Sequence, residues 1–180
     1  ANATFQVGAN AGEGIAIDSI VSANSSTLGN TALTTTSAVA GTAGVAIAAG
    51  VLFVENAAGT DIDLGPIAAA TTVAQRTQQV ADAINAKSSD TGVFAKTVLD
   101  TNGVVTGLTT FSDRAIAAGT FTGFTAASGD PAAATFATGA SQLNDISVNS
   151  FGASQEALKV IDTAINSINS SRADLGALQS

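Results

Sequence analysis

Residues 151–180, FGASQEALKVIDTAINSINSSRADLGALQS, predict one long helix with an apolar stripe of coiled-coil spacing. The stripe repeats in steps of three and four residues, which is typical of a coiled-coil seam and narrower than the apolar face of a helix in a globular core. Its members are Leu158, Ile161, Ile165, Ile168, Arg172 and Leu175, of which only Arg172 is polar. No other segment predicts a helix of equal length, so the stripe predicts assembly with helices outside this sequence.

The composition disfavours several classes of function. With 14 acidic and 6 basic residues, the formal charge is -8, so the chain cannot neutralise phosphates in number. This argues against nucleic acid and against an anionic membrane surface as partners. The chain has no cysteine and no histidine, which removes thiol chemistry, serine–histidine–aspartate triads and histidine-ligated zinc. We therefore expect no enzyme, no catalytic residue, no metal and no cofactor.

Two patterns of acidic residues could indicate a calcium site or a glycosidase active site. Both are better explained as acidic side chains on the protein surface. Asp61, Asp63 and Gly65 resemble part of a calcium loop, but the further oxygen ligand and the closing glutamate are missing at the required spacing. Alternating aspartates on the solvent face of a strand explain them better. Glu13 with Asp18, or Asp61 with Asp63, would have to face each other across a cleft to act as a glycosidase pair. The chain has no Trp or Tyr platform to hold a sugar.

One apolar run, residues 38–54, has the minimum length for a membrane span. It holds three glycines and no flanking basic residue, and the first basic residue of the chain is Arg76. Buried strands broken by glycines are therefore the better interpretation.

The remaining patterns predict mostly short strands. Alternation in Thr4–Val7 and Ile15–Asp18 predicts a hairpin, and the polar tract 22–37 predicts a crossover loop or linker. Two or three strands are expected in 38–65, with Val51–Val54 the strongest.

A helix is predicted over 71–87, because its apolar residues change to helical spacing. Thr71 or Thr72 would cap it. Its buried face would hold Val73, Thr77, Val80 and Ile84, and Ser88–Gly92 would end it.

A second hairpin is predicted after this helix, with strands Phe94–Leu99 and Val104–Leu108. Asn102-Gly103 favours a type I′ turn between them. The phenylalanines that follow would anchor a small β core: Phe111, Phe121, Phe124 and Phe136. An extended link over 141–149 leads to Ser150, which is expected to cap the final helix.

Three groups of residues resemble bacterial flagellins. Residues 5–10, FQVGAN, followed by IAID at 15–18, resemble the hairpin at the outer end of the flagellin rod domain. Residues 145–147 (DIS), 157–162 (ALKVID) and 172–179 (RADLGALQ) resemble the segment that returns the chain through the rod domain. In the middle, residues 62–64 (IDL), 80–87 (VADAINAK) and 91–93 (TGV) are similar to the hook IN motif of flagellins and hook-associated proteins.

The resemblance implies an α+β fold: a β-rich inserted outer domain with one short helix, flanked by the hairpin and the long helix of a truncated rod domain. The implied domains are residues 1–20 (rod-domain hairpin), 21–147 (variable outer domain) and 148–180 (rod-domain helix). Flagellins begin and end with long helices that pair in the filament core, so we expect a fragment that does not polymerise. The stripe would pack on N-terminal rod helices that are not in this sequence. Within this chain, we expect the hairpin 5–17 to cover part of the stripe between residues 158 and 168. The remaining residues of the stripe would be exposed or paired with another copy.

The implied function is structural: the surface-exposed part of a secreted, extracellular flagellar filament subunit that serves motility. The implied partners are other flagellin subunits, through the rod-domain helices, and an innate-immune Toll-like receptor, weakly. Two alternatives stay open, namely an adhesin that binds a glycan or receptor, and a hook-associated protein. The residues RADLGALQ favour flagellin over the latter. Two interpretations of Arg172 stay open. With Asp174 it contributes to a contact in a filament or receptor interface, or it ends the seam with its aliphatic stem buried and its guanidinium in solvent.

Overall fold

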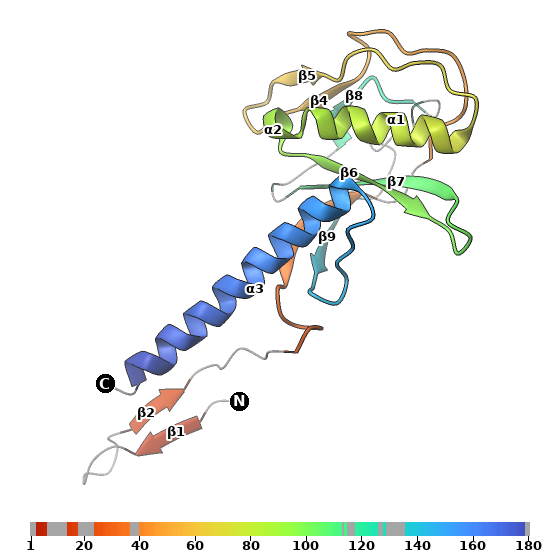
Figure 1. The fold of residues 1–180 in the computed structure, drawn as a ribbon. Helices are drawn as coiled ribbons and strands as arrows, with labels where there is room; N and C mark the ends of the chain where they lie inside the picture. The colour runs from red at the N-terminus through yellow and green to blue at the C-terminus, as the bar shows by residue number, and fades with distance from the viewer. Residues whose placement is uncertain are drawn as a thin grey trace. The chain divides into compact units, whose positions relative to one another are not determined.

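The computed structural model describes residues 3–6, 14–17, 24–36, 40–112, 114, 118–125, 128 and 136–178 (Figure 1). It confirms the predicted α+β class, with small antiparallel sheets, a short helix and a long C-terminal helix. The chain divides into two compact units. We call residues 1–31, 141–146 and 158–180 the helix unit, and residues 32–140 and 147–157 the sheet unit.

The N-terminal hairpin is present as predicted. Strand β1 (Ala3–Gln6) pairs antiparallel with β2 (Gly14–Ile17), and Phe5 lies opposite Ile15. The two strands form a sheet of their own.

The interpretation of residues 22–37 as a loop or linker was wrong in its second half. Residues 24–30 form turns, but Thr31–Thr36 form strand β3, which pairs with β7 in a four-stranded sheet of order β6-β7-β3-β9. Leu33 of β3 is buried, and Thr35 lies opposite Phe111. Threonine is a good strand residue because it is β-branched, and here tertiary pairing outweighs the polar composition of the tract.

The sheet unit is built around helix α1 and two sheets. The four-stranded sheet contributes β6 (Phe94–Leu99) and β7 (Val105–Ser112), against which α1 (Val73–Ala86) packs, as Figure 1 shows, and is completed by β9 (Phe136–Ser141). The second sheet has the order β5-β4-β8, from β4 (Phe53–Glu55), β5 (Asp61–Asp63) and β8 (Phe121–Thr122). A 3-10 turn, η1 (Ala118–Thr120), precedes β8. One hydrophobic core joins these elements: Leu52, Val54, Leu64, Ile67, Val80, Ala81, Ile84, Val93, Ala95, Leu108, Phe121 and Phe124.

Helix α1 begins where the sequence predicts. The Thr72 hydroxyl accepts a hydrogen bond from the Gln75 backbone N–H, and the Gln75 side chain accepts one from the Thr71 N–H. The first bond satisfies one of the four free N–H groups of the helix N-terminus, and the second ties the residue before the cap to the first turn.

The buried face of α1 differs from the predicted one at its first turn. Thr77, Val80 and Ile84 are buried as expected, but Val73 is 43% exposed and Arg76 is buried in its place. The Arg76 guanidinium donates to the Val45 carbonyl oxygen at 2.5 Å and to that of Gly44. A long charged side chain can be buried when its head group finds such acceptors, and a periodicity of apolar residues does not predict it.

Two turns after α1 also depart from prediction. Residues Ser88–Thr91 do not simply end the helix but form a short helix α2, which Gly92 closes in a left-handed conformation at φ +68°. In the β6–β7 hairpin, Gly103 alone has positive φ, so the turn is not type I′. The Gly103 N–H instead donates to the Asp100 carbonyl, as in a three-residue loop with a glycine bulge.

Asp100 explains why this turn forms. Its carboxylate accepts hydrogen bonds from the backbone N–H groups of Asn102 and Val104. The Val104 N–H contributes most to lowering the pKa of Asp100 below the ordinary value of an aspartate.

Three of the four predicted aromatic anchors are confirmed, since Phe111, Phe121 and Phe124 are buried. The side chain of the fourth, Phe136, lies outside the described residues. The apolar run 38–54 contributes two isolated antiparallel bridges, Gly44 to Ala70 and Ile47 to Ile67, and then strand β4. Among the described residues, no helix is long and apolar enough to span a membrane.

Candidate assembly surface

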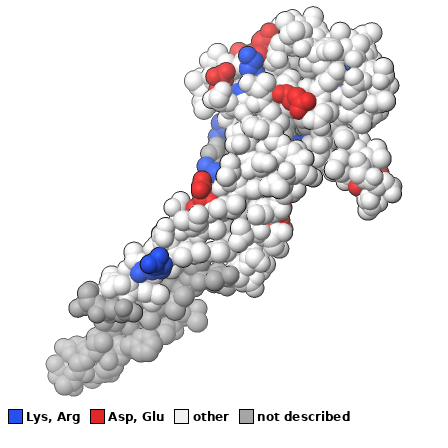
Figure 2. Space-filling view, in the orientation of Figure 1, with Lys and Arg blue, Asp and Glu red and all other residues white. Residues whose placement is uncertain are grey.

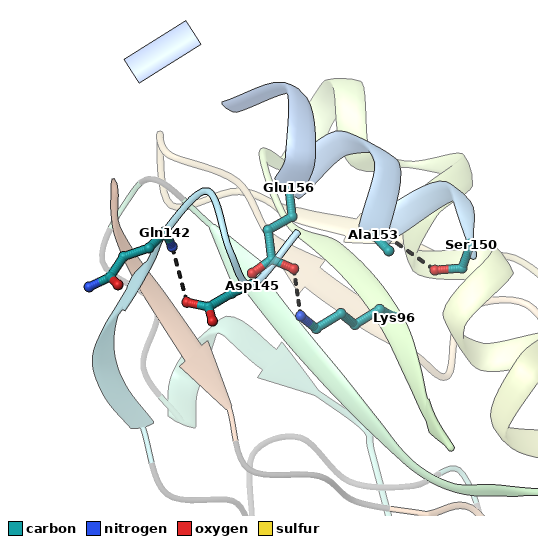
Figure 3. Close-up of polar contacts among 6 residues, drawn as sticks. All are labelled: Lys96, Gln142, Asp145, Ser150, Ala153 and Glu156. Carbon is teal, nitrogen blue, oxygen red and sulfur yellow. Dashed lines mark hydrogen bonds and ion pairs between the residues drawn. The ribbon is translucent and has the colours of Figure 1, made fainter. Parts of the chain in front are cut away.

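Helix α3 (Phe151–Leu178) carries every residue of the predicted seam. Ser150 caps it as predicted, because its hydroxyl accepts a hydrogen bond from the Ala153 N–H at 3.2 Å (Figure 3). The helix spans 28 residues, or about 42 Å at 1.5 Å per residue.

The first two turns of α3 belong to the sheet unit and pack closely on the edge strand β6. A Cβ atom on Gly152 would lie 2.0 Å from the Ala95 carbonyl oxygen, so only glycine allows this approach. The Asn85 side chain of α1 also reaches Ala95: it donates to the carbonyl oxygen at 2.9 Å and accepts from the N–H at 2.8 Å. These contacts close the edge of the sheet at this residue.

An ion pair holds the next turn of the helix. Figure 3 shows Lys96 of β6 and Glu156 of α3 pointing toward each other, with their charged atoms 2.5 Å apart. Glu156 is buried and Lys96 is partly exposed. The Lys96 ammonium also lies 5.9 Å from the Phe111 ring, which stacks on Phe94. The beginning of α3 is thus fixed by polar as well as steric contacts.

Within the helix unit, α3 packs through small side chains. Gly29, at φ +75°, lies against Val160 and Ala164: a Cβ atom there would meet the Val160 carbonyl oxygen at 2.7 Å. Val160 and Ala164 are both buried. The turn that contains Ser25 and Leu28 is hydrogen-bonded to residues 141–146. The Leu143 N–H donates to the Leu28 carbonyl oxygen, and the Asn144 N–H donates to the Ser25 carbonyl oxygen. The Asp145 carboxylate in turn accepts from the Gln142 N–H (Figure 3).

The predicted seam lies on a different part of the helix surface, and three of its apolar members are exposed. The exposed fractions are 55% for Leu158, 50% for Ile165 and 40% for Ile168. Ile161 and Leu175 are half-buried, and Arg172 is exposed. We call these six residues the assembly stripe: Leu158, Ile161, Ile165, Ile168, Arg172 and Leu175. The expected cover by the hairpin involves side chains outside the described residues.

The sequence reasoning missed the buried stripe that anchors α3. It consists of Ala153, Ala157, Val160 and Ala164, which also repeat in steps of three and four. At 100° per residue this stripe lies about a quarter turn from the assembly stripe. The signal was present in the sequence, but the larger side chains of the assembly stripe gave the stronger periodicity. Large apolar residues usually mark the buried face, and here the small ones do.

Few charged side chains lie on or beside the assembly stripe. Most of the face drawn in Figure 2 is neither acidic nor basic. Arg172 and Asp174 are both exposed, as is Asp162 beside the stripe. In the described part of the chain, no three acidic side chains gather as a group that could hold a metal ion. What the surface offers is therefore apolar contact with a few flanking charges.

Comparison with known proteins gives no match, either to a protein-family model or to a curated protein.

Proposed function

We propose that this chain is the outer, surface-exposed part of a structural subunit of a bacterial flagellar filament, exposed outside the cell, and that the subunit acts through assembly. The observation that carries the proposal is the division of α3 into two stripes. The chain buries the small side chains of this helix and leaves Leu158, Ile165 and Ile168 half exposed.

This division supports assembly on energetic grounds. Complete burial of one leucine or isoleucine side chain stabilises a protein by roughly 1.5–3 kcal/mol, so each of these half-exposed residues retains about half of that for another contact. Scattered exposed apolar residues need no explanation, but these three lie on one face at heptad spacing. A second helix with matching spacing would bury all three at once.

The flagellin-like motifs lie on ordered elements in a way that supports the same proposal. The hairpin motif begins on β1, and the motif VADAINAK ends α1. Of the return-helix motifs, residues 157–162 and residues 172–178 lie on α3. Under this proposal, α3 and the hairpin serve the repeating inner part of a filament, and the sheet unit serves as the outer domain. Identical inner contacts propagate a filament, whereas the outer domain is free to vary.

Immunogold electron microscopy tests the proposal directly. Antibodies raised against this chain are applied to intact cells of the organism that produces it, with antibodies preabsorbed on the purified chain as the control. We expect gold along the whole length of the flagellar filaments. Filaments that stay unlabelled while the cell body is labelled would contradict the proposal and favour a surface adhesin. Label confined to the hook junction would favour a hook-associated protein.

A further inference from the structure

The assembly stripe carries a charge pattern that restricts how it can pair with a copy of itself. In heptad notation, Leu158, Ile165 and Arg172 occupy one seam position, and Ile161, Ile168 and Leu175 occupy the other. Asp162 flanks the seam at the position that faces a partner helix, and it is exposed. The stripe is therefore apolar apart from one cation at its C-terminal end and one anion beside its N-terminal half.

A parallel pair of α3 helices is disfavoured by this pattern. In a parallel coiled coil each seam residue meets its own counterpart, so two Arg172 side chains would share one layer. Like charges held a few ångströms apart repel, and no acidic residue occupies a facing position near that layer to compensate.

An antiparallel pair resolves the conflict. When the helices cross between Ile165 and Ile168, each of these two residues lies opposite the other on the second copy. The same register places Leu158 opposite Leu175, and Arg172 opposite Ile161 and beside Asp162 of the second copy. Each Arg172 then has an opposite charge near it, and all the apolar members of the stripe are covered.

We propose that, in solution, α3 pairs antiparallel with α3 of a second copy of this chain through the assembly stripe, with Arg172 of each copy beside Asp162 of the other. The proposal rests on the proposed function only in assigning assembly to the same stripe. A two-fold pair closes on itself, whereas a filament needs a contact that repeats in one direction. The pair would thus cover the stripe without promoting growth, as a soluble state that competes with the filament.

Sedimentation equilibrium of the purified chain is the first test. We expect a reversible monomer–dimer equilibrium with a dissociation constant in the micromolar range, on the order of 10 µM. Ile165→Asp should abolish the dimer, while Asn166→Asp, the same charge on the adjacent exposed residue, should not. A chain that stays monomeric at about 1 mM would overturn the proposal.

Cysteine crosslinking determines the orientation, and the natural chain has no cysteine to interfere. Leu158→Cys and Leu175→Cys are prepared separately, then mixed and oxidised. An antiparallel pair gives the mixed disulfide, because each cysteine lies about 25 Å along the helix from its own counterpart, far beyond disulfide reach. Homodimeric disulfides from each variant alone would show a parallel pair and overturn the proposal.

Exchange of the two charges tests the Arg172–Asp162 contact. Arg172→Asp should weaken the dimer about fivefold, and adding Asp162→Arg should restore it, since the opposite charges are again adjacent. Asp174→Arg, a charge reversal off the stripe, should leave the dissociation constant unchanged. Failure of the double exchange to restore affinity would overturn the proposed register. None of these results depends on the labelling of filaments, so the pairing and the filament function can fail independently.

Discussion

Isoleucines play opposite parts in the two units of this molecule. Ile84 of α1 is fully buried in the core of the sheet unit, among side chains from both sheets. Ile165 of α3 is half exposed, although it lies on an equally regular helix. Ile84 is covered within the chain by its core neighbours, whereas Ile165 shares one face of α3 with the exposed Leu158 and Ile168. Equally regular helices in this chain therefore differ in whether the chain itself covers their isoleucines.

Alanine substitutions of Ile84 and Ile165 should show the largest difference in stability between the sheet unit and α3. Ile84→Ala removes buried methyl groups and leaves a cavity, so we expect the free energy of unfolding to fall by about 2–5 kcal/mol. Ile165→Ala should cost less than about 1 kcal/mol when measured at a dilution where the chain is monomeric. Urea unfolding followed by circular dichroism measures both. Equal losses would break the comparison.

Asn85 tests whether α1 protects the edge of the sheet. Asn85→Ala leaves the Ala95 N–H and C=O without the side-chain partners that they have now. An unsatisfied buried peptide group costs about 1–3 kcal/mol, so we expect a loss of that size. The control is Gln78→Ala on the exposed face of the same helix, which should change stability by less than about 0.5 kcal/mol. A similar effect of both variants would show that Asn85 does not close the edge.

The ion pair at the beginning of α3 should have a smaller effect. Lys96→Met keeps most of the side-chain length but removes the charge facing Glu156. We expect a loss of about 1 kcal/mol, because the pair is only partly buried. Faster amide exchange confined to the first turns of α3 would locate the effect. Unchanged exchange there would show that steric contacts such as Gly152 on Ala95 hold the helix alone.

These regions also differ in how far the sequence predicts them. Local signals worked where one residue decides the structure, as with the caps Thr72 and Ser150. They failed where distant contacts decide. Strand β3 forms from a polar tract because β7 pairs with it, and Arg76 replaces Val73 at the core because carbonyl groups of residues 44 and 45 accept its hydrogen bonds.

The candidate surface was predicted in part. The periodicity identified the six residues of the assembly stripe and placed them along one line of α3. It did not show that the chain anchors this helix through Val160 and Ala164 on Gly29, because small side chains give little signal in a hydrophobicity pattern. Only the tertiary contacts distinguish the two stripes: the small side chains are buried within the chain, and most of the assembly stripe is exposed.

The smallest expected effect concerns the turn at Asp100. Because the pKa of this carboxyl is lowered in the folded chain, its stabilising contribution is present above the unfolded pKa, about 3.9, and is lost as the pH falls through the folded value. An NMR titration of the carboxyl carbon should give a pKa below 3.8. The Asn102→Ala variant removes the side-chain donor of Asn102 while keeping the backbone donors, and it should raise that pKa slightly toward the ordinary value. A folded pKa at or above 3.8 would contradict the assigned hydrogen bonds.

The measurement that bears most directly on the account is filament assembly in cells that carry one substitution in the stripe. Ile165→Asp and Asn166→Asp introduce the same charge at adjacent exposed positions of α3, so neither should unfold the chain. Electron microscopy of cells in which the chromosomal copy is replaced counts their filaments. We expect few or no filaments with Ile165→Asp and normal numbers with Asn166→Asp. Normal filaments in both strains would contradict the proposal.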